Sequence, residues 1–519
     1  MCEASSNQEA DLGLHAQNKM TKETRSSSMS SSIIAYNTSV CLGLMIFAQD
    51  TTFHAGFFVT AGYSFLHPII YSCWTLLTHH RLAVICWSVA VLWAFLMFTR
   101  YRSTHHTYLL DFTCFKPRDS MKCNYELSEF ITRSNAHRFT LPSMHFQQKI
   151  FTRSGLREET YLPECIMMNP GNSTFEDARR EAEDVLFGSV QDLLGRTSVS
   201  PQDISILITN CSLHSPTPSY VSMIVNCFKL REDCKVFHLS GMGCSASLIA
   251  CNLASDLMRL KPNQYALIVS TENISLNWYP GNDKHMLVTN CLFRIGCAAM
   301  LLTNKRSERA RCKYELLHLI RTHKAAVDNA YGCAQQREDP EGTIGVALTR
   351  NLMAVAADAL HTNIRSLGPL ILPYSEQLRY VFSLFCRDIL GMKVKQYQPD
   401  FRLAVNHFCL HAGGRAVIDE IKKNLYLDEY IVEPTRCTLQ RWGNTSASSV
   451  WYVLAYMEAR ERIKANHKVW MLGLGSGFKC NSAIWRAISD VLPSETNPWA
   501  DCLNRYPVAE DPSFTKYKL

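Results

Sequence analysis

Apolar runs and amphipathic segments alternate along most of this chain. Short runs of apolar and β-branched residues have the length and composition of strands that are covered on both faces. These predicted strands are 204–211, 235–239, 265–271, 297–303, 401–405 and 468–475. Other segments repeat their apolar residues at helical spacing. These predicted helices are 178–194, 220–229, 245–260, 345–361, 378–389, 413–425 and 446–464. Such alternation predicts an α/β fold with parallel-rich sheets, in two comparable halves.

Two longer apolar segments precede this pattern. Residues 56–77 and 82–98 are almost free of charge, and each is near the length that crosses ~30 Å of hydrocarbon as a helix. Basic residues lie outside both ends of the pair, which favours both termini on the cytosolic side. We predict a membrane hairpin, with a pair of buried core helices as the alternative. The serine-rich stretch 26–32 predicts an unstructured leader instead.

These patterns divide the chain into four predicted parts. They are a leader (1–50), a membrane anchor with two transmembrane helices (51–105), a first α/β half (106–310) and a second α/β half (311–519). The net charge of +7 over 519 residues is mild and scattered, which fits an anionic small substrate or a membrane surface and argues against nucleic acid. The 21 cysteines form no C-x-x-C pair, so free thiols in a reducing compartment are expected.

One cysteine lies at a junction between a predicted strand and a predicted helix. Gly241 and Gly243 form the turn, and Cys244 immediately precedes the helix that begins at 245. A thiol there faces unpaired backbone N–H groups and the positive end of a helix dipole, both of which favour the nucleophilic thiolate. The glycines allow a substrate carbonyl to approach the backbone. The alternative is a buried structural thiol beside a glycine turn.

Polar groups with matching chemistry follow predicted strands of the second half. His407 and His411 are four residues apart, Asn444 precedes a predicted helix, and Gly475 and Gly477 belong to a glycine-rich backbone loop. A thiolate, an imidazole and an amide form a coherent set for acyl-thioester chemistry, because the last two can stabilise a developing enolate or oxyanion. Alternatives remain for each: the histidines as zinc ligands, the asparagine as a helix cap, and the loop as a weak phosphate cradle.

The sequence also resembles a known family over residues 108–483. The segments that carry the resemblance are YLLDFTCFKP (108–117), SGLREETYLP (154–163), NCSLHSPTPS (210–219), GMGCSA (241–246), TENISLNWY (271–279), NCLFR (290–294), HFCLHAGGRAVID (407–419) and GNTS (443–446). In these the chain resembles the plant 3-ketoacyl-CoA synthases, which are membrane condensing enzymes of very-long-chain fatty acid elongation. The resemblance implies a thiolase-like fold of duplicated αβαβα layers behind a transmembrane hairpin.

The resemblance also implies roles for individual residues. Cys244 would be the acylated nucleophile, and His411 and Asn444 would assist decarboxylation of malonyl-CoA and stabilise the enolate. His323 and His407 match supporting histidines of the family. No metal or other cofactor is expected beyond the substrates, acyl-CoA and malonyl-CoA.

The family further implies an endoplasmic reticulum membrane location with a cytosolic catalytic domain, contact with membrane lipid, a homodimer and other elongase subunits as partners. Two other functions remain as alternatives. One is a catalytically weak or silent membrane scaffold of the elongase complex. The other is a cysteine hydrolase, which uses a similar set of side chains.

Overall fold

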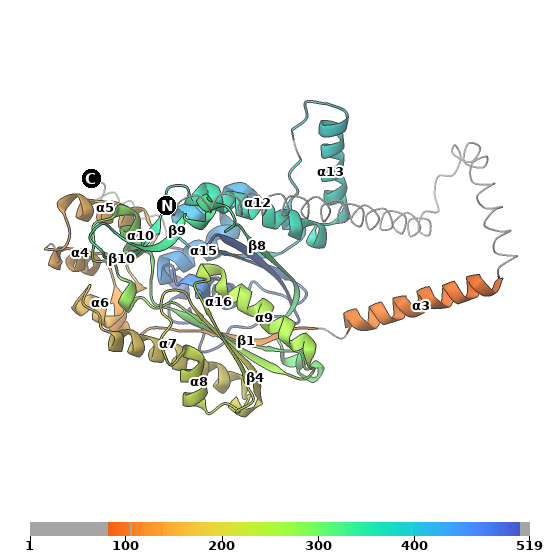
Figure 1. Ribbon diagram of the computed structural model, residues 1–519, viewed down its shortest axis with the longest axis horizontal. Helices are drawn as coiled ribbons and strands as arrows, with labels where there is room; N and C mark the ends of the chain where they lie inside the picture. Colours follow the sequence, from red (N-terminus) through yellow and green to blue (C-terminus); the bar gives the residue numbers. More distant parts are fainter. Residues whose placement is uncertain (1–80, 104–105, 136, 396, 509–519) are drawn as a thin grey trace, which may run out of the picture. The chain divides into compact units, whose positions relative to one another are not determined.

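The computed structural model describes residues 81–103, 106–135, 137–395 and 397–508 (Figure 1). The chain divides into two compact units, Met1–Tyr101 and Arg102–Leu519. The second predicted span coincides with helix α3 (Arg81–Ser103), whose described side chains, 85–97, are exposed. The leader and the first predicted span, 56–77, lie outside the described residues. Within the described part of the chain, no helix combines the length and apolar character needed to cross a membrane, so the hairpin stays a prediction.

The second unit, here called the catalytic unit, is built on one nine-stranded mixed sheet. Its strand order is β11-β12-β13-β8-β1-β7-β6-β4-β5. The strands are β1 (Tyr108–Cys114), β4 (Ile204–Cys211), β5 (Lys235–Ser240), β6 (Tyr265–Thr271), β7 (Cys297–Thr303), β8 (Tyr314–His323), β11 (His407–Leu410), β12 (Lys468–Gly475) and β13 (Lys479–Ala487). Short antiparallel pairs form separately, from β2 (Lys122–Cys123) with β3 (Thr160–Tyr161) and from β9 (Ala334–Glu338) with β10 (Ile344–Leu348).

The two halves of the sheet meet at a short antiparallel contact. Tyr108 and Leu109 of β1 pair with Glu315 and Tyr314 of β8. The predicted boundary near residue 310 falls in the 3-10 segment Arg306–Arg311, between β7 and β8. Among the described strands, only β4 with β5, β4 with β6 and β11 with β12 pair in parallel. The expectation of parallel-rich sheets is therefore wrong, because β1, β8 and β13 are inserted antiparallel strands whose sequences did not stand out as buried runs.

Helices cover both faces of the sheet and also fill the space between its halves (Figure 1). Two helices, α9 (Ala246–Leu260) and α16 (Ser449–Ala459), contact strands of both halves. Residues 449–458 of α16 are buried on every side, as expected for a helix enclosed between two layers. The outer helices are α7 (Phe175–Thr197) and α8 (Tyr220–Phe228) on the first half, and α12 (Leu352–Ile371), α14 (Arg415–Leu425) and α15 (Glu429–Trp442) on the second.

The remaining helices lie at the periphery of the catalytic unit. They are α4 (Tyr125–Ser134), α5 (Leu141–Arg153), α6 (Glu164–Met168), α10 (Lys284–Leu292), α11 (Asp328–Tyr331) and α13 (Tyr374–Leu384), the last continued by a π-helical segment Phe385–Ile389. Helix α7 begins with a full capping box, in which the Thr174 hydroxyl accepts from the Asp177 amide and the Asp177 carboxylate accepts from the Thr174 amide.

Three predicted elements differ from the structure. The predicted strand 401–405 is a 3-10 turn (Phe401–Leu403), and the strand itself starts at His407. The predicted helix 345–361 begins as β10, because residues 344–348 pair with β9 before the chain turns into α12. The predicted helix 446–464 is a 3-10 turn followed by α16, which ends at Ala459. At residues 344–348, strand pairing thus overrides the local apolar pattern.

Candidate active site

Cys244 lies on the tight turn that joins β5 to α9. Gly241 and Gly243 adopt positive φ angles of 66° and 71°, and Cys244 belongs to the 3-10 turn Gly243–Ser245 that leads into the helix. The amide of Gly243 donates to the hydroxyl of Ser212, 2.9 Å away. Cys244 as a whole residue is half-buried. The predicted strand, turn and helix are therefore confirmed around this cysteine.

The glycine-rich end of β12 packs directly against this turn. A Cβ on Gly243 would lie 2.4 Å from the backbone nitrogen of Ser476, and a Cβ on Gly475 would lie 2.7 Å from the hydroxyl of Ser245. Both positions therefore need glycine for the two backbones to approach each other. Gly475, predicted as part of a backbone loop, is thus brought to the Cys244 turn. Gly477 lies at the following turn with a φ of 87°.

A second turn, from the opposite half, approaches the same cysteine. Asn444 forms a parallel bridge with Phe293, in which the Asn444 amide donates to the Leu292 carbonyl and the Arg294 amide donates to the Asn444 carbonyl, both at 3.0 Å. The side-chain oxygen of Asn444 accepts from the amide of Ser446 at 2.9 Å. This bond fixes the amide group, so that its NH₂ faces Cys244 and the carbonyl of Gly413.

Ser446 connects the thiol to a buried carboxylate. Its hydroxyl lies 3.6 Å from the sulfur of Cys244 and 3.0 Å from Oε2 of Glu272. The other carboxylate oxygen of Glu272 accepts from the amides of Ser212 and Leu213, at 3.0 and 2.8 Å. Because the hydroxyl has one proton, it donates either to the carboxylate or to the sulfur. Sequence reasoning assigned no role to Ser446 or Glu272, although both lie in segments that carry the family resemblance.

Burial governs the protonation of this group. It raises the pKa of the Cys244 thiol to about 12, against the hydrogen bonds from Ser446 and Asn444, and the negative charge of Glu272 acts in the same direction as burial. Burial also raises the pKa of Glu272. The thiolate expected at the start of the helix is therefore not favoured in the substrate-free site. With its pKa raised by burial, the resting cysteine is a neutral thiol.

His411 follows β11 and is almost fully buried. Its Nδ1 lies 2.9 Å from the hydroxyl of Ser449, and a Cβ on Gly413 would lie 2.8 Å from its Nε2. Burial lowers the pKa of His411 to about 4, so the ring is neutral at physiological pH. If Ser449 donates to Nδ1, the ring proton is on Nε2, which makes that atom a hydrogen-bond donor. The amide of Asn444 contacts the same loop, since it donates to the Gly413 carbonyl at 3.4 Å.

The two supporting histidines occupy different places. His407 is the first residue of β11, and its Nε2 lies 2.9 Å from Nδ1 of His467. Burial lowers its pKa to about 4. His407 begins the four-residue strand and His411 follows its last residue, so the two lie roughly 13 Å apart along the chain and cannot share one metal ion. His323 ends β8 opposite Lys479 and lies at the Gly477 turn, where burial and the charge of Lys479 lower its pKa.

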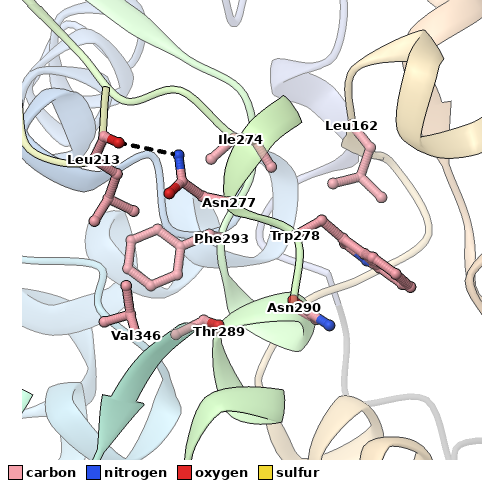
Figure 2. Close-up of a pocket in the computed structure, with 9 residues that line it drawn as sticks. All are labelled: Leu162, Leu213, Ile274, Asn277, Trp278, Thr289, Asn290, Phe293 and Val346. Atoms are coloured by element: carbon pink, nitrogen blue, oxygen red, sulfur yellow. Dashed lines mark hydrogen bonds between the residues drawn. The ribbon is translucent and has the colours of Figure 1, made fainter. Parts of the chain in front are cut away.

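A narrow apolar pocket adjoins the site (Figure 2). Figure 2 shows the side chains of Leu213, Ile274, Phe293 and Val346 around it, with the amide of Asn277 donating to the carbonyl of Leu213 at 3.5 Å. Two of its residues belong to the site framework, since the Leu213 amide binds Glu272 and Phe293 forms the bridge with Asn444. Leu162, Trp278 and Asn290 also line a larger cavity of about 270 Å³ between α4 and α5.

Two family models together match most of the catalytic unit. Residues 98–389 match the FAE1/type III polyketide synthase-like protein family, and residues 403–487 match the C-terminal domain of 3-oxoacyl-[acyl-carrier-protein] synthase III. The chain is 51% identical to 3-ketoacyl-CoA synthase 11 of Arabidopsis thaliana, over 84% of this chain and 86% of that protein. It is 52% identical to 3-ketoacyl-CoA synthase 2 of the same plant, over 84% of each.

The chain belongs to the 3-ketoacyl-CoA synthase family. As a member, it is an acyl-transferring condensing enzyme of the thiolase-like class. Solved structures agree on the fold. A fungal type III polyketide synthase superposes with a TM-score of 0.59 at 14% identity, over 73% of this chain and 99% of that one. The structure of PKS-I from the brown alga Ectocarpus siliculosus gives a TM-score of 0.57 at 16% identity, over 74% of this chain and 98% of that one. The predicted thiolase-like α/β fold is thereby confirmed.

Proposed function

We propose that this 3-ketoacyl-CoA synthase condenses a long-chain acyl-CoA with malonyl-CoA through an acyl-Cys244 intermediate, and so acts in very-long-chain fatty acid elongation. One observation carries the assignment of residues: the Asn444–Ser446 turn of the second half reaches the Cys244 thiol of the first half, with 3.6 Å between the Ser446 hydroxyl and the sulfur. The proposal is also supported by the chain's membership of a family of acyl-transferring enzymes and by the position of Cys244 at the start of a helix.

The first stage is transfer of the acyl group. The sulfur of Cys244 attacks the acyl-CoA carbonyl, the bond to the CoA sulfur breaks, and the thiol proton leaves with CoA as CoA-SH. The neutral resting thiol supplies that proton at the moment of transfer, which explains why a high pKa is compatible with the reaction. The apolar pocket of Figure 2 adjoins the site framework, and its apolar side chains are where an acyl chain would meet this part of the protein.

The second stage forms the carbon–carbon bond. Malonyl-CoA loses CO₂, the resulting enolate attacks the acyl-Cys244 carbonyl, and the carbon–sulfur bond breaks to release 3-oxoacyl-CoA. The Cys244 thiolate then takes a proton from solvent. Nε2–H of neutral His411 and the NH₂ of Asn444 donate hydrogen bonds to the enolate oxygen. Since release of CO₂ drives the step, we propose that the reaction uses no metal or redox cofactor.

We further propose the location and assembly of this enzyme. The apolar segments 56–77 and 82–98 anchor it in the endoplasmic reticulum membrane, with the catalytic unit on the cytosolic side and in contact with lipid. Two copies pair through β5, which is the edge strand of the sheet and exposes Lys235 and Val236. An unpaired strand edge of this kind is suited to pairing with a second copy. Other elongase subunits complete the proposed complex.

The decisive experiment measures product from purified full-length protein in vesicles. Wild type is expected to convert labelled malonyl-CoA and acyl-CoA to 3-oxoacyl-CoA with ping-pong kinetics, whereas Cys244→Ala forms none. Cys227→Ala is the matched control, because Cys227 is an exposed thiol on α8. Elongation by Cys244→Ala would refute the proposed nucleophile. Release of free fatty acid by wild type would identify a hydrolase, and absence of any product would identify a silent scaffold.

A further inference from the structure

Helix α13 and the π-helical segment after it carry an unusual row of exposed apolar side chains. The residues share one face of the helix, because each lies three or four positions from another member of the row. We call this row the α13 stripe. It consists of Tyr374, Leu378, Val381, Phe382, Phe385 and Ile389. Five of its six members are more than half exposed, with Tyr374 at 84%, Ile389 at 71%, Phe382 at 67%, Leu378 at 66% and Val381 at 59%.

The opposite face of α13 is the one held by the catalytic unit. The carboxylate of Glu376 is buried and accepts hydrogen bonds from the Tyr397 hydroxyl at 2.8 Å and the Asp400 amide at 2.9 Å. Gln377 donates to the Leu372 carbonyl at 2.8 Å. These polar contacts fix the helix so that the stripe faces outward, and Figure 1 shows α13 standing out from the layered body. An outward row of this kind marks an interaction surface, whereas single exposed apolar residues are ordinary.

Charge around the stripe indicates which partner it fits. Residues 374–395 contain four basic and two acidic residues. Arg379 pairs with Glu376 and Arg387 pairs with Asp388, so the basic excess is carried by two lysines. Lys393 and Lys395 follow the helix on exposed backbone beyond Gly391. An apolar helix face with an aromatic residue at one end and basic residues beside it is typical of helices that lie in a lipid–water interface. Anionic headgroups complement the basic residues, and acyl chains complement the stripe.

A second copy of the chain fits less well. From Tyr374 to Ile389 the helical segment is about 24 Å long, and a stripe about 10 Å wide covers roughly 240 Å². A stable protein–protein interface needs about 800 Å² on each partner. A bilayer sets no such minimum, because shallow insertion of a few apolar side chains already gains free energy.

We propose that the α13 stripe docks on the surface of a lipid bilayer, with Lys393 and Lys395 at anionic headgroups. This gives the catalytic unit its own membrane contact, in addition to the amino-terminal anchor, and it rests on the membrane location proposed above. The anchor holds the unit near the bilayer at high effective concentration, so a shallow contact of this size is sufficient.

The test uses full-length protein in phosphatidylcholine vesicles that contain phosphatidylserine. A photoreactive residue is introduced as Leu378→p-benzoylphenylalanine or Phe382→p-benzoylphenylalanine, and the products of irradiation are identified by mass spectrometry. The matched control is Leu260→p-benzoylphenylalanine, since Leu260 ends α9, is 75% exposed and lies outside the stripe. We expect lipid adducts at 378 and 382 and none at 260. Lys393→Glu and Lys395→Glu are each expected to lower adduct yield about fivefold.

Other outcomes overturn the proposal in distinguishable ways. Protein–protein adducts at 378 or 382 would assign the stripe to a second copy. Absence of adducts in protein that floats with the vesicles would show that the stripe does not reach lipid. The membrane location proposed for the amino-terminal anchor would not be affected by that result. Protein that does not float at all would overturn both the docking and the membrane location. Formation of 3-oxoacyl-CoA by the same samples tests the proposed reaction separately, and the stripe variants are expected to retain it.

Discussion

The contact between Glu272, Ser446 and Cys244 predicts that Glu272→Gln makes the nucleophile more acidic. Glutamine keeps an oxygen toward the amides of Ser212 and Leu213 and places an NH₂ group toward Ser446. The Ser446 hydroxyl then accepts from that NH₂, and its own proton becomes available to the sulfur. The substitution also removes a negative charge that raises the pKa of Cys244. Both changes favour the thiolate.

The magnitude follows from the geometry. Hydrogen-bond lengths of 3.6 and 3.0 Å place the sulfur within about 6.6 Å of the carboxylate oxygen, where a unit charge at an effective dielectric constant of about 20 contributes about 2.5 kcal/mol. That energy corresponds to just under two pKa units, or a roughly 70-fold larger thiolate fraction at pH 8. A less basic thiolate is also a weaker nucleophile, which offsets about sevenfold of the gain. The net expectation is alkylation about tenfold faster.

The assay is the rate of iodoacetamide labelling of Cys244 across pH 6–10, followed peptide by peptide because the chain has 21 cysteines. Glu181→Gln is the control, since Glu181 is another buried carboxylate and accepts from the amides of Ile274 and Ser275. Its Cys244 rate should match wild type. A Glu272→Gln protein that labels at the wild-type rate or more slowly would refute the argument that this carboxylate and Ser446 set the thiol pKa.

Three further outcomes follow from the same geometry. Gly243→Ala should lower the free energy of unfolding by about 2 kcal/mol or more and abolish condensation. The reason is that its Cβ would lie 2.4 Å from the Ser476 nitrogen, at a φ of 71°. Thermal unfolding and a parallel activity assay check the two effects. Ser449→Ala should lower kcat about tenfold with KM little changed, because the tautomer of His411 loses its partner; a wild-type kcat would contradict this. The free energy of unfolding should fall by about 3 kcal/mol as the pH drops from about 6.5 to about 4, because of His411. Its pKa is about 4 in the folded protein, so over this range the unfolded chain binds the proton and the folded protein does not. In urea unfolding, the stability of wild type should depend more steeply on pH than that of His411→Gln.

Strands that are continuous apolar runs were predictable in place and length. The predicted bounds of 265–271, 297–303 and 468–475 coincide with β6, β7 and β12, whose residues are almost all buried. β8 and β13 were not predicted, although they form the centre of the second half. Side chains of β8 are mostly half-buried and include charged residues, so the pattern of a doubly covered strand is absent from its sequence.

Some residues of the candidate site could likewise be predicted from the sequence, and others could not. Cys244 and Asn444 were predictable because turns have local sequence signals, here glycines around Cys244 and an amide residue before a helix at Asn444. Glu272 was not, because its significance comes from the Ser212 and Leu213 amides and from Ser446, which the fold brings to it from distant segments. The pKa of Cys244 was misjudged for the same reason, since burial is a property of the assembled halves.

The bridge between Phe293 and Asn444 has a consequence for recombining relatives of this enzyme. Two backbone hydrogen bonds tie the Asn444 turn to residues 292–294, which belong to the other half of the chain. A Cβ on Gly443 would lie 2.4 Å from the side chain of Arg294, so the two segments must suit each other sterically. Hybrids that exchange halves should therefore inherit residues 290–296 and 441–446 from a single parent, and crossovers that separate them should yield inactive protein.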